Sequence, residues 1–165
     1  MQAFLLLGSN KGDRADYLAR ARHAIGNRAG NMLSASSVYE TAAWGKPDQP
    51  PFLNQVVMIE TELLPRELLA EALSIEMALG RKPGEKWSQR IIDIDILFYG
   101  GLVVQQEDLI IPHLLIAQRR FTLVPLAELA PDFQHPVLKK TIRELLNECD
   151  DTLGVEIWVN SPPSS

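Results

Sequence analysis

The sequence predicts a single α+β domain whose elements follow the order β-α-β-β-α-β, with additions after Gly100. Short apolar segments bounded by glycine and turn residues predict the strands, and two segments with apolar residues at helical spacing predict the helices. The chain has 165 residues, of which 46% are hydrophobic, so it is long enough for one core and short for two domains. We expect one domain over residues 1–160 and a disordered tail over 161–165.

The first strand is expected over residues 2–8, and it ends in the turn-rich segment 8–12. Such a turn can present backbone N–H groups to an anion, or it can simply connect the strand to the next helix. Asp13 can serve as the N-cap of that helix, which should extend to about Gly30. Its buried stripe consists of apolar residues at helical spacing: Leu18, Ala21 and Ile25.

Two further strands are expected over residues 33–39 and 52–62. The segment between them, 40–51, contains three prolines and shows no periodicity. A connection of this length in a small domain is more often functional than decorative. Asn54 lies beside it, and an asparagine amide can read the edge of a heterocycle or can satisfy a structural hydrogen bond.

The second helix is expected to begin at Pro65, because proline is favoured at the first helical position, and to end at Gly80. Its buried stripe is Leu68, Ala72, Ile75 and Leu79. A basic segment, residues 81–90, follows the helix and leads directly into the next strand. A cationic loop in this position can bind phosphate groups, or it can be a solvated run of charge.

Residues 90–99 predict a buried strand in which Asp93 and Asp95 interrupt an apolar run. Because side chains alternate along a strand, both carboxylates leave the same face, with Cα atoms roughly 6.6 Å apart. Two like charges on an apolar strand repel each other and are costly to desolvate unless a cation meets them. Mg²⁺ prefers carboxylate oxygen. A strand end at which both aspartates reach water fits the pattern equally well.

The elements expected after the glycine pair are shorter. Residues 102–104 predict an edge strand, and alternating apolar residues predict a last strand over 155–159. Thr141 and Glu144 form a capping box that predicts a helix. His113 follows a proline, and a lone histidine more often satisfies a local hydrogen bond than binds a ligand.

The composition excludes several classes of protein. A single cysteine, Cys149, rules out an internal disulfide framework and a cysteine-rich zinc site. No apolar run approaches the roughly 20 residues that span a bilayer, and the first residues lack the pattern of a signal peptide. The net charge of −5 argues against a broad nucleic-acid surface. We therefore expect a cytoplasmic protein without nucleic-acid or membrane partners, and we also expect it to be a monomer.

Nine short motifs occur in one order over about residues 5–131, and the ordered set is specific although each motif is weak alone. They are Leu7-Gly-Ser-Asn10, Val38-Tyr-Glu-Thr41, Phe52-Leu-Asn-Gln55, Leu79-Gly-Arg81, Trp87 with Arg90, Ile92-Asp-Ile-Asp-Ile96, Ile111-Pro-His113, Arg119 with Phe121, and Pro125-Leu-x-Glu128. In this set the chain resembles the bacterial 6-hydroxymethyl-7,8-dihydropterin pyrophosphokinase family of folate biosynthesis.

The resemblance implies a ferredoxin-like α+β sandwich built on an antiparallel sheet. It also implies transfer of the terminal diphosphate of ATP to the hydroxymethyl oxygen of 6-hydroxymethyl-7,8-dihydropterin, with release of AMP. Asp93 and Asp95 would bind two Mg²⁺ ions that bridge the phosphates of the co-substrate ATP. Arg81 and Arg90 would hold the phosphates and stabilise the transition state. Asp95, or its neighbour Asp93, would help to take the proton of the pterin hydroxyl.

The same resemblance implies which residues bind each substrate. The pterin ring would stack between two aromatic side chains, and a third would close over it. The implied pterin site is Thr41, Phe52, Asn54, Trp87, Asp93 and Phe121. The implied ATP site is Glu76, Arg81, Arg90, Ile96, His113 and Arg119.

The chain departs from the family pattern in its loops. The altered positions are Ala42-Ala43-Trp44, the short segment 82–86, Ser88-Gln89, and Asp108 where a basic residue is expected. Two other interpretations stay open at this point. One is a different Mg²⁺-dependent phosphotransferase that shares the Asp-x-Asp site, and the other is a non-catalytic module that binds a pterin or a nucleotide.

Overall fold

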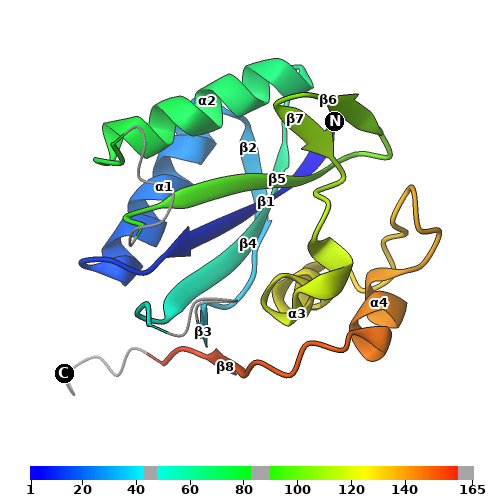
Figure 1. The fold of residues 1–165 in the computed structure, drawn as a ribbon. Coiled ribbons are helices and arrows are strands. Elements are labelled where there is room, and N and C mark those ends of the chain that lie inside the picture. The colour runs from blue at the N-terminus through cyan, green and yellow to red at the C-terminus, as the bar shows by residue number, and fades with distance from the viewer. Residues whose placement is uncertain (43–47, 83–89, 160–165) are drawn as a thin grey trace.

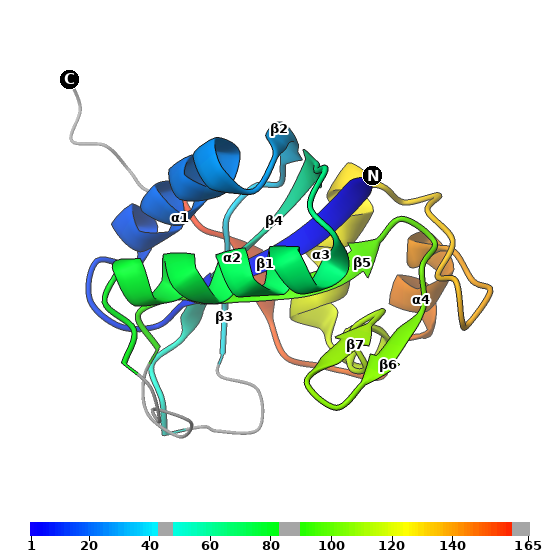
Figure 2. The same ribbon diagram turned by 90° about the horizontal axis from the view of Figure 1, so that it is seen from above.

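The computed structural model of the protein describes residues 1–42, 48–82 and 90–159. These residues form helices packed on both faces of an antiparallel sheet (Figure 1; Figure 2). In chain order the elements are β1 (Gln2–Ser9), α1 (Arg14–Arg28), β2 (Asn31–Ala35), β3 (Tyr39–Thr41), β4 (Phe52–Glu60), α2 (Pro65–Ala78), β5 (Asp93–Tyr99), β6 (Val104–Gln106), β7 (Leu109–Ile111), the 3-10 helix η1 (Ile116–Gln118), α3 (Arg120–Leu129), α4 (Ile142–Glu148) and β8 (Val155–Ile157).

The main sheet is organised around β1. The strand order is β5-β1-β4-β3-β8, and β2 also pairs with β4. Every one of these pairings is antiparallel. Because β2 and β3 pair with successive parts of β4, they act together as one strand position. The predicted alternation of strands and helices up to Gly100 is therefore confirmed.

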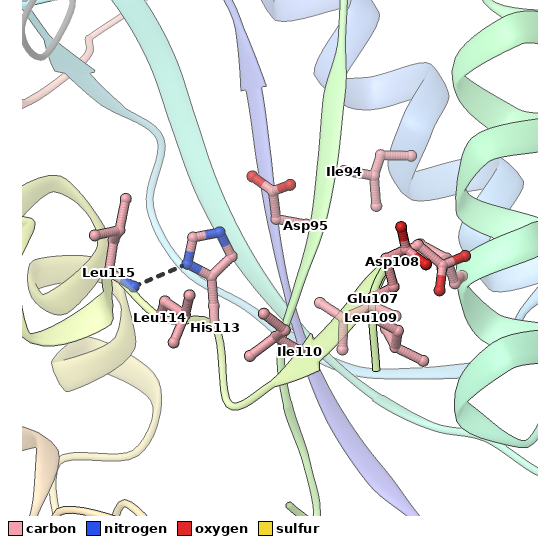
Figure 3. A pocket seen from close by; sticks show the side chains of 11 residues that line it. Ile94, Asp95, Glu107, Asp108, Leu109, Ile110, His113, Leu114 and Leu115 are labelled. Atoms are coloured by element: carbon pink, nitrogen blue, oxygen red, sulfur yellow. Dashed lines mark hydrogen bonds between the residues drawn. The ribbon is translucent and has the colours of Figure 1, made fainter. Parts of the chain in front are cut away.

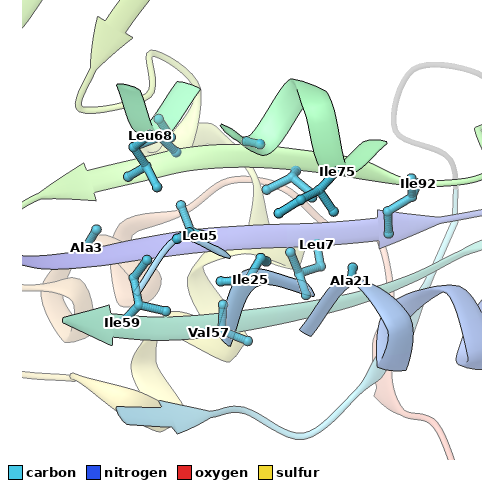
Figure 4. Close-up of a cluster of buried hydrophobic side chains, with 14 of the residues drawn as sticks. Ala3, Leu5, Leu7, Ala21, Ile25, Val57, Ile59, Leu68, Ile75 and Ile92 are labelled. Carbon is cyan, nitrogen blue, oxygen red and sulfur yellow. The ribbon is translucent and has the colours of Figure 1, made fainter. Parts of the chain in front are cut away.

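Hydrophobic side chains cover both faces of the sheet. Along β1, Ala3, Leu5 and Leu7 point toward α1 and α2, whereas Phe4 and Leu6 point toward α3 and α4. Figure 4 shows the first of these clusters, in which side chains of both helices lie against β1. Each fully buried leucine or isoleucine contributes about 1.5–3 kcal/mol relative to an exposed one. The strand is thus held by packing on both sides.

Several local predictions are confirmed. The Asp13 side chain accepts a hydrogen bond from the Asp16 N–H at 3.1 Å, as an N-cap should. The expected buried stripe of α1 is buried, and α2 begins at Pro65 with three of its four expected apolar residues fully buried. The capping box of Thr141 and Glu144 is present at the start of α4. Cys149 ends α4 and packs against the second cluster.

The single strand predicted over 33–39 is wrong, because residues 36–38 interrupt it. Ser36 explains the interruption, since its hydroxyl accepts the Val56 N–H at 3.0 Å and its carbonyl accepts the Gln55 amide at 2.6 Å. A side chain therefore replaces part of the backbone ladder. Likewise, Glu40 and Thr41 belong to β3, and not to the irregular connection that was expected over 40–51.

Other predicted boundaries also need correction. β5 begins at Asp93, because the backbone of Arg90 pairs with Asn10 instead of continuing the ladder. The edge strand expected over 102–104 is replaced by β6, which pairs with β7 in a separate two-stranded sheet. β4 ends at Glu60, and the last strand, β8, is shorter than residues 155–159. The expected tail, 161–165, lies outside the described residues.

None of the helices in the described ranges combines the length and hydrophobicity needed to cross a membrane.

Gly30 is predicted to be required for packing between α1 and β4. A Cβ atom added there would overlap the carbonyl oxygen of Glu60, whereas one added at Gly26 in α1 would meet nothing within 4 Å. We expect Gly30→Ala to lower the free energy of unfolding by about 1–3 kcal/mol. The matched variant Gly26→Ala should raise it by about 0.5–1 kcal/mol, because alanine is the better helix former. Urea denaturation of both variants checks this, and equal stabilities would contradict it.

Candidate active site

The end of β1 lies between two strands that carry most of the predicted site residues. Gly8 pairs with Asn54 of β4 on one side and with Asp93 of β5 on the other. Neighbouring strands lie about 4.8 Å apart, so the two strands place their side chains on either side of a narrow glycine position. The fold thus brings together residues that are far apart in the chain.

Asp93 and Asp95 leave the same face of β5, as the sequence predicts. Ile94 and Ile96, which alternate with them, belong to the cluster under α1 and α2. The aspartates therefore point to the opposite face, where Leu97 packs toward α3 and α4. In Figure 1 these two helices lie against one end of that face, and the end of the sheet that carries Asp93 extends beyond them.

Arginine side chains surround the two aspartates. The Arg81 and Arg90 guanidinium groups both contact Asp93 Oδ1, with Nη1 to Oδ1 distances of 3.0 and 3.1 Å. Burial raises the pKa of the Asp93 carboxyl, and the neighbouring Asp95 raises it further, while the two arginines act in the opposite direction. Burial likewise raises the pKa of Asp95, and Arg119 is the first of the arginines that counteract it. The pair is thus desolvated and faced by cations.

Glu76 of α2 is a buried charge that was not predicted to be buried. Its Oε2 accepts the Ile94 N–H at 2.6 Å, and its Oε1 accepts from Arg81 Nη1 at 2.7 Å. Among the residues that the structure describes, β5 has a strand neighbour on one side only, so the carboxylate accepts an N–H on its open edge. Burial raises the pKa of Glu76 to about 7. Glu76 comes four residues after Ala72 and therefore lies on the apolar stripe of the helix. This spacing is the sequence signal that could have predicted its burial.

A pocket of about 430 Å³ opens beside Asp95. His113 and Ile96, both predicted to contact the nucleotide, line it. Figure 3 shows His113 beside Asp95. The Nδ1 atom of His113 accepts the Leu115 N–H at 3.2 Å, and burial lowers the pKa of the ring. A neutral ring with an accepting Nδ1 carries its proton on Nε2. The remaining lining residues are Leu69, Ile94, Glu107, Asp108, Leu109, Ile110, Leu114 and Leu115.

The rim of this pocket carries the acidic residue Asp108, at a position where the family pattern has a basic residue. Asp108 forms an exposed ion pair with Arg66 of α2, with an Oδ1 to Nη2 distance of 2.6 Å. The pair brings a guanidinium group to the rim from a different element. An exposed pair of this kind contributes little to stability, on the order of 0–1 kcal/mol.

Three residues of the predicted pterin site lie near the start of β4, and a fourth lies in α3. Thr41 of β3 pairs with Phe52, and the Asn54 amide donates to the Thr41 hydroxyl at 2.7 Å. Asn54 and Thr41 are buried. Phe121 lies in the first turn of α3, and the Arg119 guanidinium carbon lies 5.5 Å from the centre of its ring, within the range of a cation–π contact.

Helix α3 is held in place by Glu128, the last residue of the Pro125-Leu-x-Glu128 motif. Its carboxylate accepts the Tyr39 hydroxyl at 2.5 Å and the Ser37 N–H at 2.7 Å. Burial and this carboxylate raise the pKa of Tyr39 to about 12. The C-terminal end of α3 is therefore tied to β3 and to the residue two positions before it.

Some predicted site residues cannot be placed in this arrangement. Trp87 lies outside the described residues, as do Trp44, most of the segment 82–86, and Ser88-Gln89. Arg81, Arg90, Asp93, Asp95, Glu76, Ile96, His113 and Arg119 come together around β5, and Thr41, Phe52 and Asn54 gather on β3 and β4.

The two aspartates fit a magnesium site better than a protein-only metal site. No group of three or more His, Cys, Asp or Glu side chains in the described ranges is arranged to hold a metal ion. Mg²⁺ is usually bound through one or two carboxylates together with substrate phosphates and water. Asp93 and Asp95 supply such a pair, and a cation would offset the cost of their desolvation.

A desolvated carboxylate pair, facing arginines and an adjacent pocket define the class of a phosphate-transferring enzyme. Residues 4–131 match the family described as 7,8-dihydro-6-hydroxymethylpterin-pyrophosphokinase (HPPK). The chain belongs to this family.

Relatives from bacteria agree with the family match. The chain is 46% identical, over 94% of its length and 97% of the other chain, to a protein of Methylorubrum extorquens named 2-amino-4-hydroxy-6-hydroxymethyldihydropteridine pyrophosphokinase. It is 40% identical to the protein of that name from Aquifex aeolicus, over 88% of this chain and 90% of the other.

A solved structure supports the fold. A triple mutant of HPPK-DHPS from Plasmodium falciparum superposes with a TM-score of 0.74 at 20% identity, over 88% of this chain. This chain spans 44% of the Plasmodium chain. At such low identity the match concerns the fold alone, a mixed arrangement of helices and antiparallel sheet.

Glu76→Gln is predicted to change how stability depends on pH. The pKa of Glu76 is raised from 4.5 to about 7, so folding favours the protonated form, and Glu76 lowers stability as the pH rises from about 4.5 through about 7. We expect the free energy of unfolding of the variant, relative to the unmodified protein, to increase by about 2–3 kcal/mol between pH 5 and pH 8. Urea denaturation in metal-free buffer measures this difference.

Glu144→Gln is the matched control for this experiment. Capping hydrogen bonds from Thr141 lower the pKa of Glu144, so its contribution to stability is present at high pH and is lost as the pH falls. The free energy of unfolding of this control variant, relative to the unmodified protein, should not increase between pH 5 and pH 8. A difference that stays constant from pH 5 to pH 8 for Glu76→Gln would contradict the prediction.

Proposed function

We propose that this protein transfers the diphosphate of ATP to the hydroxymethyl oxygen of 6-hydroxymethyl-7,8-dihydropterin, releasing AMP, as an enzyme of folate biosynthesis. The observation that carries this proposal is the desolvated pair Asp93 and Asp95, faced by arginines, in a chain of the HPPK family. Transfer of phosphoryl groups needs positioning and compensation of charge more than covalent chemistry. The site offers both.

The finer features of the fold form part of the proposal. A ferredoxin-like sandwich is supported by the order β5-β1-β4 with β2 and β3 next to β4, together with the β-α-β-β-α-β order of the chain. A single domain over residues 1–160 is supported by the two clusters that share the main sheet. The monomeric state and cytoplasmic location rest on composition alone.

The ATP site is assigned to the pocket beside Asp95. Ile96 and the leucine side chains give it apolar walls, and His113 offers an Nε2–H donor for the nucleotide. Arg81 and Arg90 both contact Asp93 Oδ1, so phosphates bound next to Asp93 lie within reach of both guanidinium groups. Arg119 is the third cation of this site, and Glu76 acts by holding Arg81.

The pterin site is assigned to the neighbouring end of β4. Phe52 and Phe121 are partly exposed aromatic residues that can stack on a flat heterocycle. Asn54 is held by Thr41, which leaves its carboxamide oxygen to read the ring edge. Trp87 is assigned to this site from the family resemblance alone.

In the proposed reaction the pterin hydroxymethyl oxygen attacks the β-phosphorus of ATP. The bond between the β-phosphorus and the oxygen that bridges the α- and β-phosphates breaks, and AMP leaves with that oxygen. Asp95 is assigned as the group that accepts the hydroxyl proton, since its carboxylate lies beside the pocket proposed for ATP. Two Mg²⁺ ions held by Asp93 and Asp95 would neutralise phosphate charge and align the reacting groups.

Asp95→Asn tests the transfer and the carboxylate site together. Purified protein is incubated with Mg²⁺, ATP and 6-hydroxymethyl-7,8-dihydropterin, and the nucleotide products are separated. We expect AMP in step with pterin diphosphate from the unmodified protein, and a loss of at least about 100-fold in rate for the variant. Asp132→Asn, at an exposed position, should keep the full rate.

Other products would point to the two alternative interpretations. Formation of ADP in place of AMP would identify a different phosphotransferase. Tight pterin binding without turnover would identify a binding module.

Gly8→Ala is predicted to weaken pterin binding selectively. A Cβ at Gly8 would lie 2.9 Å from Asn54 Oδ1 and 3.5 Å from Phe52 Cδ1. The Asn54 amide must shift, and this disturbs its hydrogen bond to Thr41. We expect the binding free energy of the pterin to weaken by about 1–3 kcal/mol, which is roughly tenfold or more in Kd. Calorimetry should show this loss for pterin and an unchanged Kd for Mg²⁺ with α,β-methylene ATP. Gly101→Ala, where nothing lies within 4 Å, is the control, and equal effects on both ligands would contradict the assignment.

A further inference from the structure

Asn10 is a buried residue that joins two separate segments of the chain. It directly follows β1 and is 1% exposed. Its Oδ1 accepts the Arg90 N–H at 2.6 Å, and its own N–H donates to the Arg90 carbonyl at 2.9 Å. Its Nδ2 donates to the Pro50 carbonyl at 3.1 Å and to Gln49 Oε1 at 3.3 Å. Every polar atom of the side chain is therefore used.

The two segments lead into different halves of the proposed active site. Gln49 and Pro50 come shortly before Phe52, at the start of the pterin strand β4. Arg90 comes shortly before Asp93, at the start of β5, and its guanidinium group contacts that aspartate. β1 lies between β4 and β5, so a residue at its end can reach both. Only an amide side chain offers an acceptor and two donors at once.

We propose that Asn10 is a positioning residue that sets the placement of the pterin relative to the phosphates of ATP. This inference rests on the proposed function. Transfer of the diphosphate needs the attacking oxygen within about 3–3.5 Å of the phosphorus, and a displacement of about 1 Å can cost on the order of 100-fold in rate. Asn10 fixes the backbone that carries Arg90 and the segment that enters Phe52 through a single carboxamide.

The structure supplies a control residue in Arg14. Its Nη1 donates to the Pro51 carbonyl at 2.9 Å and pairs with Glu40. Arg14 therefore holds the same segment before β4 from helix α1 without any hydrogen bond to Arg90. Removing it loosens one side of the junction, whereas changing Asn10 breaks the connection between the two sides.

Asn10→Asp and Asn10→Ala test the proposal. The aspartate keeps an acceptor for the Arg90 N–H and loses both donors, and the alanine loses all three bonds without adding charge. We expect kcat for pterin-dependent AMP release to fall about 100-fold in Asn10→Asp. The Kd values for pterin and for Mg²⁺ with α,β-methylene ATP should stay within about threefold, because each half of the site remains intact. Arg14→Gln leaves the bonds of Asn10 in place, so it should keep kcat and both Kd values within about threefold.

The readouts separate positioning from folding. Retained kcat in Asn10→Asp would overturn the proposal. In a second outcome, kcat falls, both ligands bind more weakly and the urea midpoint is lower. This outcome would assign Asn10 to folding alone, and it would also overturn the proposal. If Asn10→Ala does not fold, the measurements on Asn10→Asp distinguish these outcomes. If the unmodified protein releases no AMP, the proposed function fails, and that result is distinct from a failure of Asn10 in an active enzyme.

Discussion

Three carboxylates at one end of the sheet, one buried and two half-buried, set the main physical constraint on this protein. Glu76, Asp93 and Asp95 are desolvated, and burial is the first cause of the raised pKa of each. An uncompensated buried charge costs several kcal/mol even after relaxation. The chain meets this cost with guanidinium groups from separate places: Arg81 after α2, Arg90 before β5, and Arg119 before α3. The positions of these elements depend on one another for this reason.

The balance of charge also supports the proposal that this site accepts a highly charged nucleotide. Arg81 and Arg90 hold the same oxygen of Asp93, which is also the kind of ligand that Mg²⁺ prefers. In the proposed function, a divalent cation held by the aspartates would leave the arginines to bind phosphates. The positive charge of the cation and the negative charge of the phosphates would then offset each other within the site. Arg81 would remain attached through Glu76.

The Gly8-Ser9-Asn10 segment serves this site in two different ways. Gly8 contributes by having no side chain, since Asn54 and Phe52 occupy the space beside it. Asn10 contributes through hydrogen bonds to the segments that precede β4 and β5. The segment is therefore more than a turn between β1 and α1. Its location at the end of the central strand gives it access to both halves of the site.

The sequence by itself determined the features that depend on neighbouring residues. Helical spacing, the Asp13 cap, the capping box at Thr141 and the common face of Asp93 and Asp95 follow from local periodicity, and the ordered motifs indicated the family. The tertiary structure alone decided the burial of Glu76, the break at Ser36, the separate sheet of β6 and β7, and the bonds of Asn10. Each of these depends on which distant segments meet, and a hydrogen bond such as that between Asn10 and Arg90, 80 positions apart, leaves no periodic signal in the chain.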